Sequence, residues 1–382
     1  MSFLKRDDIC WIPWVCGNIH PCYFGCCCYE PTQSKETYGN HFAKWSSQDF
    51  ENWWNGKGMH DLRRNMLQKG ATNTCPSWCT FNSIPKRTSV ASKTFENLKK
   101  IKNSKSLQET IEDFDKGKIN LRSKPLKTSL SLGMTYNSKC TFCIQRWKLD
   151  NKNNYDRNTG RSEANTDEIL QILQTLHPDL ITCHITGGDL FAFRPYILET
   201  ILQRLLLYDI KGEATTNAIG LTPEIYEKYI HNTFSIITFS TTTTNKEEYA
   251  YFHGVDSWDR VKNNLEKISN KFENHCIKKC AICIMKHNYN KMQDIIKFCA
   301  DNNITTISLL PVEPTSLIRR KMGEESMSHP NNIQRFMDEW DDLSAGYEEL
   351  VKQNGMAIGG HNAAKDLINK YADVFIKEKN NV

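Results

Sequence analysis

The sequence predicts an α/β protein whose main part is a partial (β/α)6 TIM-like barrel. Three observations predict this fold. Residues 126–320 alternate short apolar runs rich in β-branched residues with longer amphipathic segments. Eight of the fifteen cysteines and six of the nine tryptophans precede residue 80, which indicates a small Cys-rich metal-binding domain before the barrel. After residue 320 the apolar residues recur at helical spacing, which predicts a helical C-terminal tail.

Six strands are expected in the barrel, and the segments between them are predicted to be helices. Ile169, Ile172, Leu173 and Leu176 recur at i, i+3, i+4 and i+7, and a second helix has the same spacing over 292–299. Strands joined by helices of this length must run parallel, because each crossover needs a dozen or more residues. Six such units leave the barrel open. The predicted strands are 129–135, 180–186, 210–217, 235–241, 278–285 and 305–311.

Four segments follow from these patterns. Residues 1–85 form the Cys-rich domain, 86–125 a Lys-rich linker with some helix, 126–320 the barrel, and 321–382 the helical extension. In the extension, Ile333, Phe336, Met337 and Trp340 make one apolar stripe. We expect this stripe to cover the open side of the barrel.

Composition narrows the class of protein. The chain has 382 residues, 39% of them hydrophobic and 24% charged, with a formal net charge of +5. These values are typical of globular domains, and the basic residues are spread along the chain, so neither nucleic-acid nor membrane binding is indicated. We expect a cytoplasmic protein. An odd number of cysteines in such a chain indicates metal or redox chemistry rather than disulfides.

The chemistry-bearing residues follow predicted strands. Cys140 and Cys143 are spaced C-x2-C after the first strand, and Phe142 lies between them. The second strand runs into Gly187 and Gly188, which allow a ligand to approach the backbone closely. Active sites collect at the carboxyl ends of parallel strands, so both motifs are candidate site elements.

The motifs in residues 126–315 resemble those of the radical SAM superfamily in their order and spacing. That family has C-x3-C-x2-C after its first strand, and here Asn137, Cys140, Phe142 and Cys143 fit the pattern while Tyr136 takes the place of the first cysteine. The resemblance implies a [4Fe-4S] cluster that binds S-adenosyl-L-methionine through one open iron. It also implies cofactor-binding residues: a turn that receives the methionine amino group, and contacts to the ribose and carboxylate. Gly187, Gly188 and Asp189 correspond to the turn. Asn217, which follows Thr216, and Ser240 correspond to the contacts with the ribose and carboxylate.

Tyr136 leaves three interpretations open. The cluster assembles with a substitute ligand, either the Tyr136 phenolate or the thiol of Cys183 on the second strand. Alternatively, the site is degenerate and the protein is not catalytic, or the chain is an inactive variant of an enzyme.

The N-terminal segment has a second resemblance, to the SPASM or twitch modules that bind auxiliary iron–sulfur clusters. Its G-x4-C element ends at Cys22, and a C-x3-C pair follows WNG and LRRNMLQKG. The resemblance implies Cys10, Cys22, Cys75 and Cys79 as ligands. We expect the four thiolates to hold an iron–sulfur cluster; structural zinc is the alternative, and buried thiols without metal are the third.

Cys276, Cys280 and Cys283 also spell C-x3-C-x2-C. They fall on the fifth predicted strand, where residues three apart point to opposite faces. We therefore expect strand residues rather than a shared cluster.

The resemblance implies an enzyme that reductively cleaves S-adenosyl-L-methionine to a 5′-deoxyadenosyl radical, which abstracts hydrogen from a substrate. A peptide or protein substrate is expected, as is an electron donor such as a flavodoxin or ferredoxin. The alternatives are a catalytically degenerate scaffold that binds metal clusters or a partner, and a zinc-stabilised binding protein.

Overall fold

The structure is a computed structural model, and the residues it describes fall into two compact units. One unit comprises Met1–Gly133, Asp156–Gly187 and Arg194–Glu213, and the other comprises Met134–Tyr155, Gly188–Phe193 and Ala214–Val382. The described residues are 3–6, 8–20, 23–26, 47–75, 90–133, 135–143, 166–192, 195–271, 276–311, 330–360 and 368.

Four strands lie in the first unit: β1 (Cys16–His20), β2 (Tyr23–Gly25), β3 (Lys127–Ser131) and β4 (Thr182–Thr186). They are ordered β2-β1-β3-β4, with β2 antiparallel to β1 and the other two pairs parallel. The N-terminal segment thus adds two strands beside the first barrel strand.

Helices of the first unit bury large aromatic side chains from the N-terminal third of the chain. Trp14 and Phe114 are fully buried, and their rings meet edge to face with centroids 5.2 Å apart. Residues 86–125, expected to be a linker with some helix, contain α5 and α6, which bury Phe95 and Leu107. The helices are η1 (Phe3–Lys5), α1 (Ile12–Val15), α2 (Ser47–Trp54), α3 (Lys57–Thr74), α5 (Val90–Ile101), α6 (Lys105–Asp115), α8 (Thr166–Leu176) and α9 (Pro195–Leu207).

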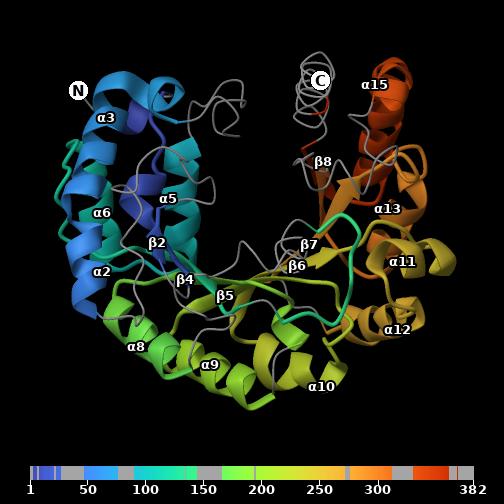
Figure 1. Ribbon diagram of the computed structural model, residues 1–382, viewed down its shortest axis with the longest axis horizontal. Helices are drawn as coiled ribbons and strands as arrows, with labels where there is room; N and C mark the ends of the chain where they lie inside the picture. The colour runs from blue at the N-terminus through green and yellow to red at the C-terminus, as the bar shows by residue number, and fades with distance from the viewer. Residues whose placement is uncertain are drawn as a thin grey trace, which may run out of the picture. The chain divides into compact units, whose positions relative to one another are not determined.

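The second unit contains four parallel strands, β6 (Phe234–Ser240), β7 (Ile277–Ile284), β8 (Thr306–Pro311) and β9 (Ala357–Gly359), in that order. Strand β5 (Lys211–Thr216) has residues in both units. Figure 1 shows α11, α12 and α13 grouped beside β6 and β7. The helical elements of this unit are η2 (Leu190–Ala192), α10 (Pro223–Ile225), η3 (Tyr226–Ile230), α11 (Lys246–His253), α12 (Trp258–Ser269), α13 (Met292–Asp301) and α15 (Pro330–Gln353).

The α/β class and the six predicted strands are confirmed, each with small shifts at its ends. The predicted strand 235–241 is β6, and the predicted helices at 169–176 and 292–299 are α8 and α13. In α13, Ile295, Ile296 and Cys299 are buried, as helical periodicity requires. Strands β1, β2 and β9 were not expected, because three to five residues carry too little pattern to distinguish them from loops.

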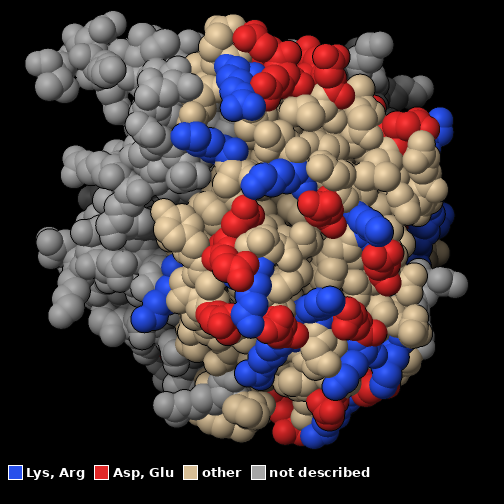
Figure 2. Space-filling view, turned by 90° about the vertical axis from the view of Figure 1, so that its right-hand side faces the viewer, with Lys and Arg blue, Asp and Glu red and all other residues tan. Residues whose placement is uncertain are grey.

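Charges on the surface are mixed in sign. On the face drawn in Figure 2, Lys and Arg side chains are interspersed with Asp and Glu side chains rather than gathered into one basic patch. Ion pairs such as Arg335–Glu339 at 2.8 Å and Lys291–Glu248 at 3.1 Å join neighbours of opposite sign. Within the described part of the chain, no helix is both long and apolar enough to span a bilayer.

Candidate functional site

The candidate site is built on the segment Tyr136–Cys143, here called the cysteine loop. The carboxyl end of α11 holds this loop through two backbone hydrogen bonds: Lys139 N–H donates to the His253 carbonyl at 2.7 Å, and Thr141 N–H donates to the Phe252 carbonyl at 2.8 Å. Gly254 ends α11 in the left-handed region at φ 65°, and a Cβ there would lie 2.8 Å from the Lys139 carbonyl oxygen. The close approach of helix and loop therefore requires glycine at this position.

The turn Gly187–Gly188–Asp189, here called the GGD turn, packs against the start of the same loop. Gly188 has φ +64°, and a Cβ added to it would lie 2.0 Å from the Thr135 carbonyl oxygen. That oxygen accepts a 2.9 Å hydrogen bond from Asp189 N–H. Gly187, at φ +85°, approaches the Gly133 carbonyl in the same way. Both glycines are thus needed for backbone-to-backbone packing.

Asp189 fixes the end of β5 to this turn. Its side chain is 4% exposed, and Oδ2 accepts hydrogen bonds from Thr216 Oγ1 at 2.9 Å and from Asn217 N at 2.8 Å. Oδ1 accepts a third bond, from Phe191 N at 3.0 Å. Burial raises the pKa of Asp189, and the three hydrogen bonds oppose that rise. The carboxylate is therefore an internal anchor.

Asn217 connects the end of β5 to the cysteine loop. Its Nδ2 donates to Asn137 Oδ1 at 2.6 Å and to Ser138 Oγ at 3.2 Å, and its Oδ1 accepts from Ile219 N–H at 3.0 Å. Each of these groups is satisfied within the protein, so the amide acts as a rigid cross-link. Asn217 thereby holds the residues that directly precede Cys140.

The sulfur of Cys140 lies against a buried imidazole. Cys140 Sγ is 3.3 Å from His253 Nδ1 and 3.5 Å from Ser138 Oγ. His253 is 1% exposed, and its Nε2 lies 3.2 Å from Thr242 Oγ1. Burial, with a smaller contribution from His287, lowers the pKa of His253 to about 4. The ring is thus neutral near pH 7, and it can donate a hydrogen bond to sulfur from Nδ1 while Nε2 accepts one from Thr242.

Aromatic side chains surround this imidazole. Tyr249 stacks on His253 with ring centroids 4.1 Å apart, and Phe142 of the cysteine loop meets it edge to face at 5.5 Å. Phe252 stacks on His287 at 3.5 Å. The hydrogen bond between Cys140 and His253 is therefore kept in apolar surroundings, where it is stronger than in water.

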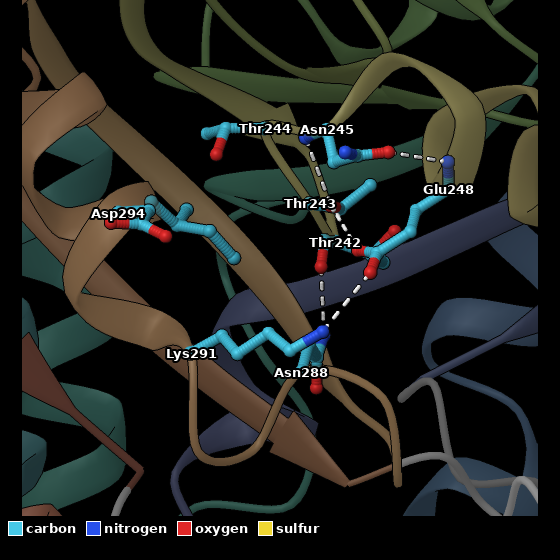
Figure 3. A pocket seen from close by; sticks show the side chains of 9 residues that line it. Thr242, Thr243, Thr244, Asn245, Glu248, Asn288, Lys291 and Asp294 are labelled. Atoms are coloured by element: carbon cyan, nitrogen blue, oxygen red, sulfur yellow. Dashed lines mark hydrogen bonds and ion pairs between the residues drawn. The ribbon is translucent and has the colours of Figure 1, made fainter.

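Asn288 continues the hydrogen-bonded network to β7. Its Nδ2 donates to the Thr242 carbonyl at 2.9 Å and to the Cys283 carbonyl at 2.8 Å. Figure 3 shows Thr242 and Asn288 at the edge of a polar cavity of about 170 Å³, in which Glu248 accepts a 2.7 Å bond from Thr243 and a 3.1 Å bond from Lys291. A continuous chain of contacts thus runs from Cys140 through His253, Thr242 and Asn288 to Cys283.

The structure brings most of the predicted barrel residues together. Tyr136, Cys140 and Cys143 share one loop and are half-buried, and the GGD turn and Asn217 pack against that loop. Ser240 is half-buried at the carboxyl end of β6, beside Ala281 of β7. The expected ligand and cofactor roles of these residues stay predictions.

The remaining barrel cysteines lie on or next to strands β4 and β7, or on α13. Cys183 is fully buried in the first half of β4, in register with Thr128, and burial raises its pKa, as does nearby Glu213. Cys280, also fully buried, forms a hydrogen bond with Cys299 of α13. Cys276 precedes β7, and Cys283 is its next-to-last residue.

The described N-terminal cysteines are dispersed over several elements. Cys10 and Cys26 are buried, Cys16 begins β1, and Cys75 caps the end of α3. Cys22 and Cys79 lie outside the described residues. Among the residues that the structure describes, no three His, Cys, Asp or Glu side chains converge to hold a single metal ion.

A buried cation lies near one of these thiols. Arg63 is fully buried, its Nε and Nη1 donate to the carbonyls of Pro13 and Ile119, and its guanidinium lies 4.5 Å from the Trp54 ring centroid. Burial lowers the pKa of Arg63 to about 9, while Cys26 acts in the opposite direction. A negative charge in this region would therefore be stabilised.

Sequence reasoning missed the supports of the cysteine loop: Ser138, His253, Thr242 and Asn288. The pair His253–Gly254 after an amphipathic segment is a recognisable helix end, because a left-handed glycine follows many helices. Nothing in the sequence placed that helix end against residues 139–141, since the contact spans more than a hundred residues.

Comparisons with known proteins find a family match in the part of the chain that contains Cys140 and Cys143 of the cysteine loop. Residues 137–299 match the model of the Radical SAM superfamily. No curated protein matches the chain.

Several solved structures are similar to the chain. Streptococcus suis SuiB bound to precursor peptide SuiA has 18% identity and a TM-score of 0.46, over 79% of this chain and 66% of that chain. Native anSMEcpe with bound AdoMet and Cp18Cys peptide has 15% identity and a TM-score of 0.44, over 62% of this chain and 63% of that one. Coproporphyrinogen III oxidase (HemN) from Escherichia coli, described as a radical SAM enzyme, has 12% identity and a TM-score of 0.44, over 61% and 54%.

These likenesses cover only part of each neighbour. The chain spans 64–66% of the length of the SuiB chains, just under two thirds.

Proposed function

We propose that the protein is a radical SAM enzyme that binds a [4Fe-4S] cluster and S-adenosyl-L-methionine at the cysteine loop. The observation that carries this proposal is the packing of the cysteine loop on the GGD turn and on Asn217, inside the region that matches the Radical SAM superfamily. Three motifs far apart in sequence thus meet at one place.

The donor set fits an iron–sulfur cluster. Cys140 and Cys143 supply two half-buried thiols on a loop that backbone hydrogen bonds at Lys139 and Thr141 hold against the end of α11. Soft thiolates are the ligands that such clusters take, and hydrogen bonds to their sulfurs tune the cluster. Gly188 supports the S-adenosyl-L-methionine site because it lets the turn approach the cysteine loop closely. When bound, the two cofactors supply reductive cleavage of S-adenosyl-L-methionine and a 5′-deoxyadenosyl radical that abstracts hydrogen.

The protein's own residues orient these groups and exclude water. His253 forms a hydrogen bond with the Cys140 sulfur through Nδ1 and is held in place by Thr242 through Nε2. Asp189 fixes the turn and the end of β5 as one rigid element. Tyr249 and Phe252 provide the apolar wall behind the loop.

The substrate proposed here is a peptide or protein, and the electron donor is a flavodoxin or ferredoxin. Peptide-bound structures of SuiB and anSMEcpe are among the similar chains. The expected auxiliary iron–sulfur cluster on Cys10, Cys22, Cys75 and Cys79 belongs to the same proposal, with zinc as the alternative metal.

A direct test is anaerobic reconstitution with iron and sulfide, followed by reduction with dithionite in the presence of S-adenosyl-L-methionine. Formation of 5′-deoxyadenosine and methionine, measured by mass spectrometry, is the expected result. The double variant Cys140→Ser/Cys143→Ser is the matched control and should form neither product. Equal product in both proteins would refute the proposal.

A second candidate is a degenerate scaffold that binds a cluster or partner without cleaving S-adenosyl-L-methionine. Two observations favour it: Tyr136 occupies the first cysteine position, and the Asp189 carboxylate already accepts three internal hydrogen bonds. This candidate predicts bound iron in the reconstituted protein with no 5′-deoxyadenosine above the double-variant background.

A further inference from the structure

The cysteine loop contains two thiols, whereas a site-differentiated [4Fe-4S] cluster with one open iron needs three protein ligands. The missing ligand must come from a side chain near Cys140 and Cys143, at the carboxyl ends of the parallel strands. Cys183, His253 and Cys283 are the strongest candidates beside Tyr136.

Cys183 does not fit this requirement. It is the second residue of β4, in register with Thr128, the second residue of β3. Its side chain is fully buried in the first half of the strand, away from the carboxyl end at which the GGD turn begins.

His253 is close to the loop but has no nitrogen left for iron. Its Nδ1 lies 3.3 Å from the Cys140 sulfur itself, and its Nε2 lies 3.2 Å from Thr242 Oγ1. With both ring nitrogens engaged, the imidazole orients Cys140 instead of ligating a metal.

Cys283 lies at the carboxyl end of a parallel strand, where the third ligand is required. It is the next-to-last residue of β7 and is half-buried. Cys280, three residues earlier, points toward α13 and bonds Cys299, so the pleat of the strand directs Cys283 to the opposite, inner face. The contact chain through His253, Thr242 and Asn288 connects Cys140 to the Cys283 carbonyl.

Electrostatic coupling supports the same placement. Cys283 interacts electrostatically with Cys140 and Cys143 of the cysteine loop, as well as with Cys280 on its own strand.

We propose that Cys283 is the third cluster ligand, completing with Cys140 and Cys143 a three-thiolate site that Tyr136 does not supply. This inference rests on the proposed function and replaces the expectation that Cys283 is only a strand residue.

The test compares iron and sulfide in anaerobically reconstituted full-length proteins. Cys283→Ser should lose about four irons per chain relative to wild type, the same loss as Cys140→Ser/Cys143→Ser. Cys280→Ala, on the other face of β7, and Tyr136→Phe should keep the wild-type content. In the Cys283→Ser background, Tyr136→Cys restores the family's own ligand position and should recover the lost iron.

Each outcome separates this inference from the proposed function. If Cys283→Ser keeps its iron, or loses iron that Tyr136→Cys does not recover, the third-ligand assignment is wrong, while cleavage of S-adenosyl-L-methionine by wild type still supports the enzyme. If wild type holds no more iron than the Cys140→Ser/Cys143→Ser variant, both fall. If the iron pattern is as expected but wild type forms no 5′-deoxyadenosine, the ligand assignment stands and the scaffold alternative replaces the enzyme.

Discussion

Replacing Gly188 with alanine tests whether the GGD turn supports the cysteine loop. The new Cβ would lie 2.0 Å from the Thr135 carbonyl oxygen, whereas real Cβ atoms stay beyond 3.0 Å, so the two backbones must separate by about 1 Å. The 2.9 Å hydrogen bond from Asp189 N–H to that oxygen would be weakened or lost. We therefore expect both lower stability and a displaced cysteine loop.

The magnitude follows from three contributions. A left-handed backbone costs a residue with a Cβ roughly 1–2 kcal/mol. Loss of one internal hydrogen bond adds about 1 kcal/mol, and the displaced loop adds a comparable amount. The free energy of unfolding of Gly188→Ala should thus fall by about 3–4 kcal/mol.

Gly355→Ala is the matched control. Gly355 has φ +65°, nearly the same as Gly188, but nothing lies within 4 Å of an added Cβ. Only the cost of the left-handed backbone applies, so its free energy of unfolding should fall by about 1–2 kcal/mol.

Urea denaturation followed by circular dichroism measures both variants, and iron analysis after reconstitution reports on the loop. Gly188→Ala should lose at least about 1 kcal/mol more than Gly355→Ala and should also lose bound iron. Equal destabilisation of the two variants, with unchanged iron, would show that the turn does not pack on the loop as described.

Three further predictions concern single side chains. Because the pKa of Asp189 is raised in the folded protein, its contribution to stability is present at low pH and is lost as pH rises from about 4 upward. The urea midpoint of wild type should therefore fall over this pH range, and the midpoint of Asp189→Asn should not show that fall. Parallel pH profiles of the two midpoints would contradict this prediction. Asn217→Ala removes the donor to Asn137 and Ser138, so cysteine-loop thiols should alkylate several-fold faster in the metal-free protein by peptide mass spectrometry, and unchanged rates would argue against the cross-link. Cys280→Ala removes a small buried thiol and should lower the free energy of unfolding by about 1 kcal/mol; a loss above about 3 kcal/mol would contradict its simple packing role.

The sequence was informative wherever a pattern is local. Short runs of seven or eight residues predicted the six barrel strands, and helical spacing predicted α8 and α13. The GGD turn was identified because two adjacent glycines follow a strand, where they were expected to let a ligand approach the backbone closely. These features depend on residues that are near one another in the chain.

Features that depend on distant contacts could not be predicted. The pairing of β1 with β3 joins Cys16 to Lys127, and no local pattern encodes that partner. Likewise, His253 is an ordinary histidine in sequence, and its contact with Cys140 depends on where α11 ends. Alternation along β7 predicts that Cys280 and Cys283 lie on opposite faces, but it could not show that the Cys280 face meets α13.

Electron paramagnetic resonance of the reduced, reconstituted protein, with and without S-adenosyl-L-methionine, tests the central claim most directly. A cluster held at the cysteine loop with one open iron should change its spectrum when S-adenosyl-L-methionine is added. The Cys140→Ser/Cys143→Ser variant should show neither that signal nor that change. A spectrum that is the same with and without S-adenosyl-L-methionine, or the same in the double variant, would contradict the account.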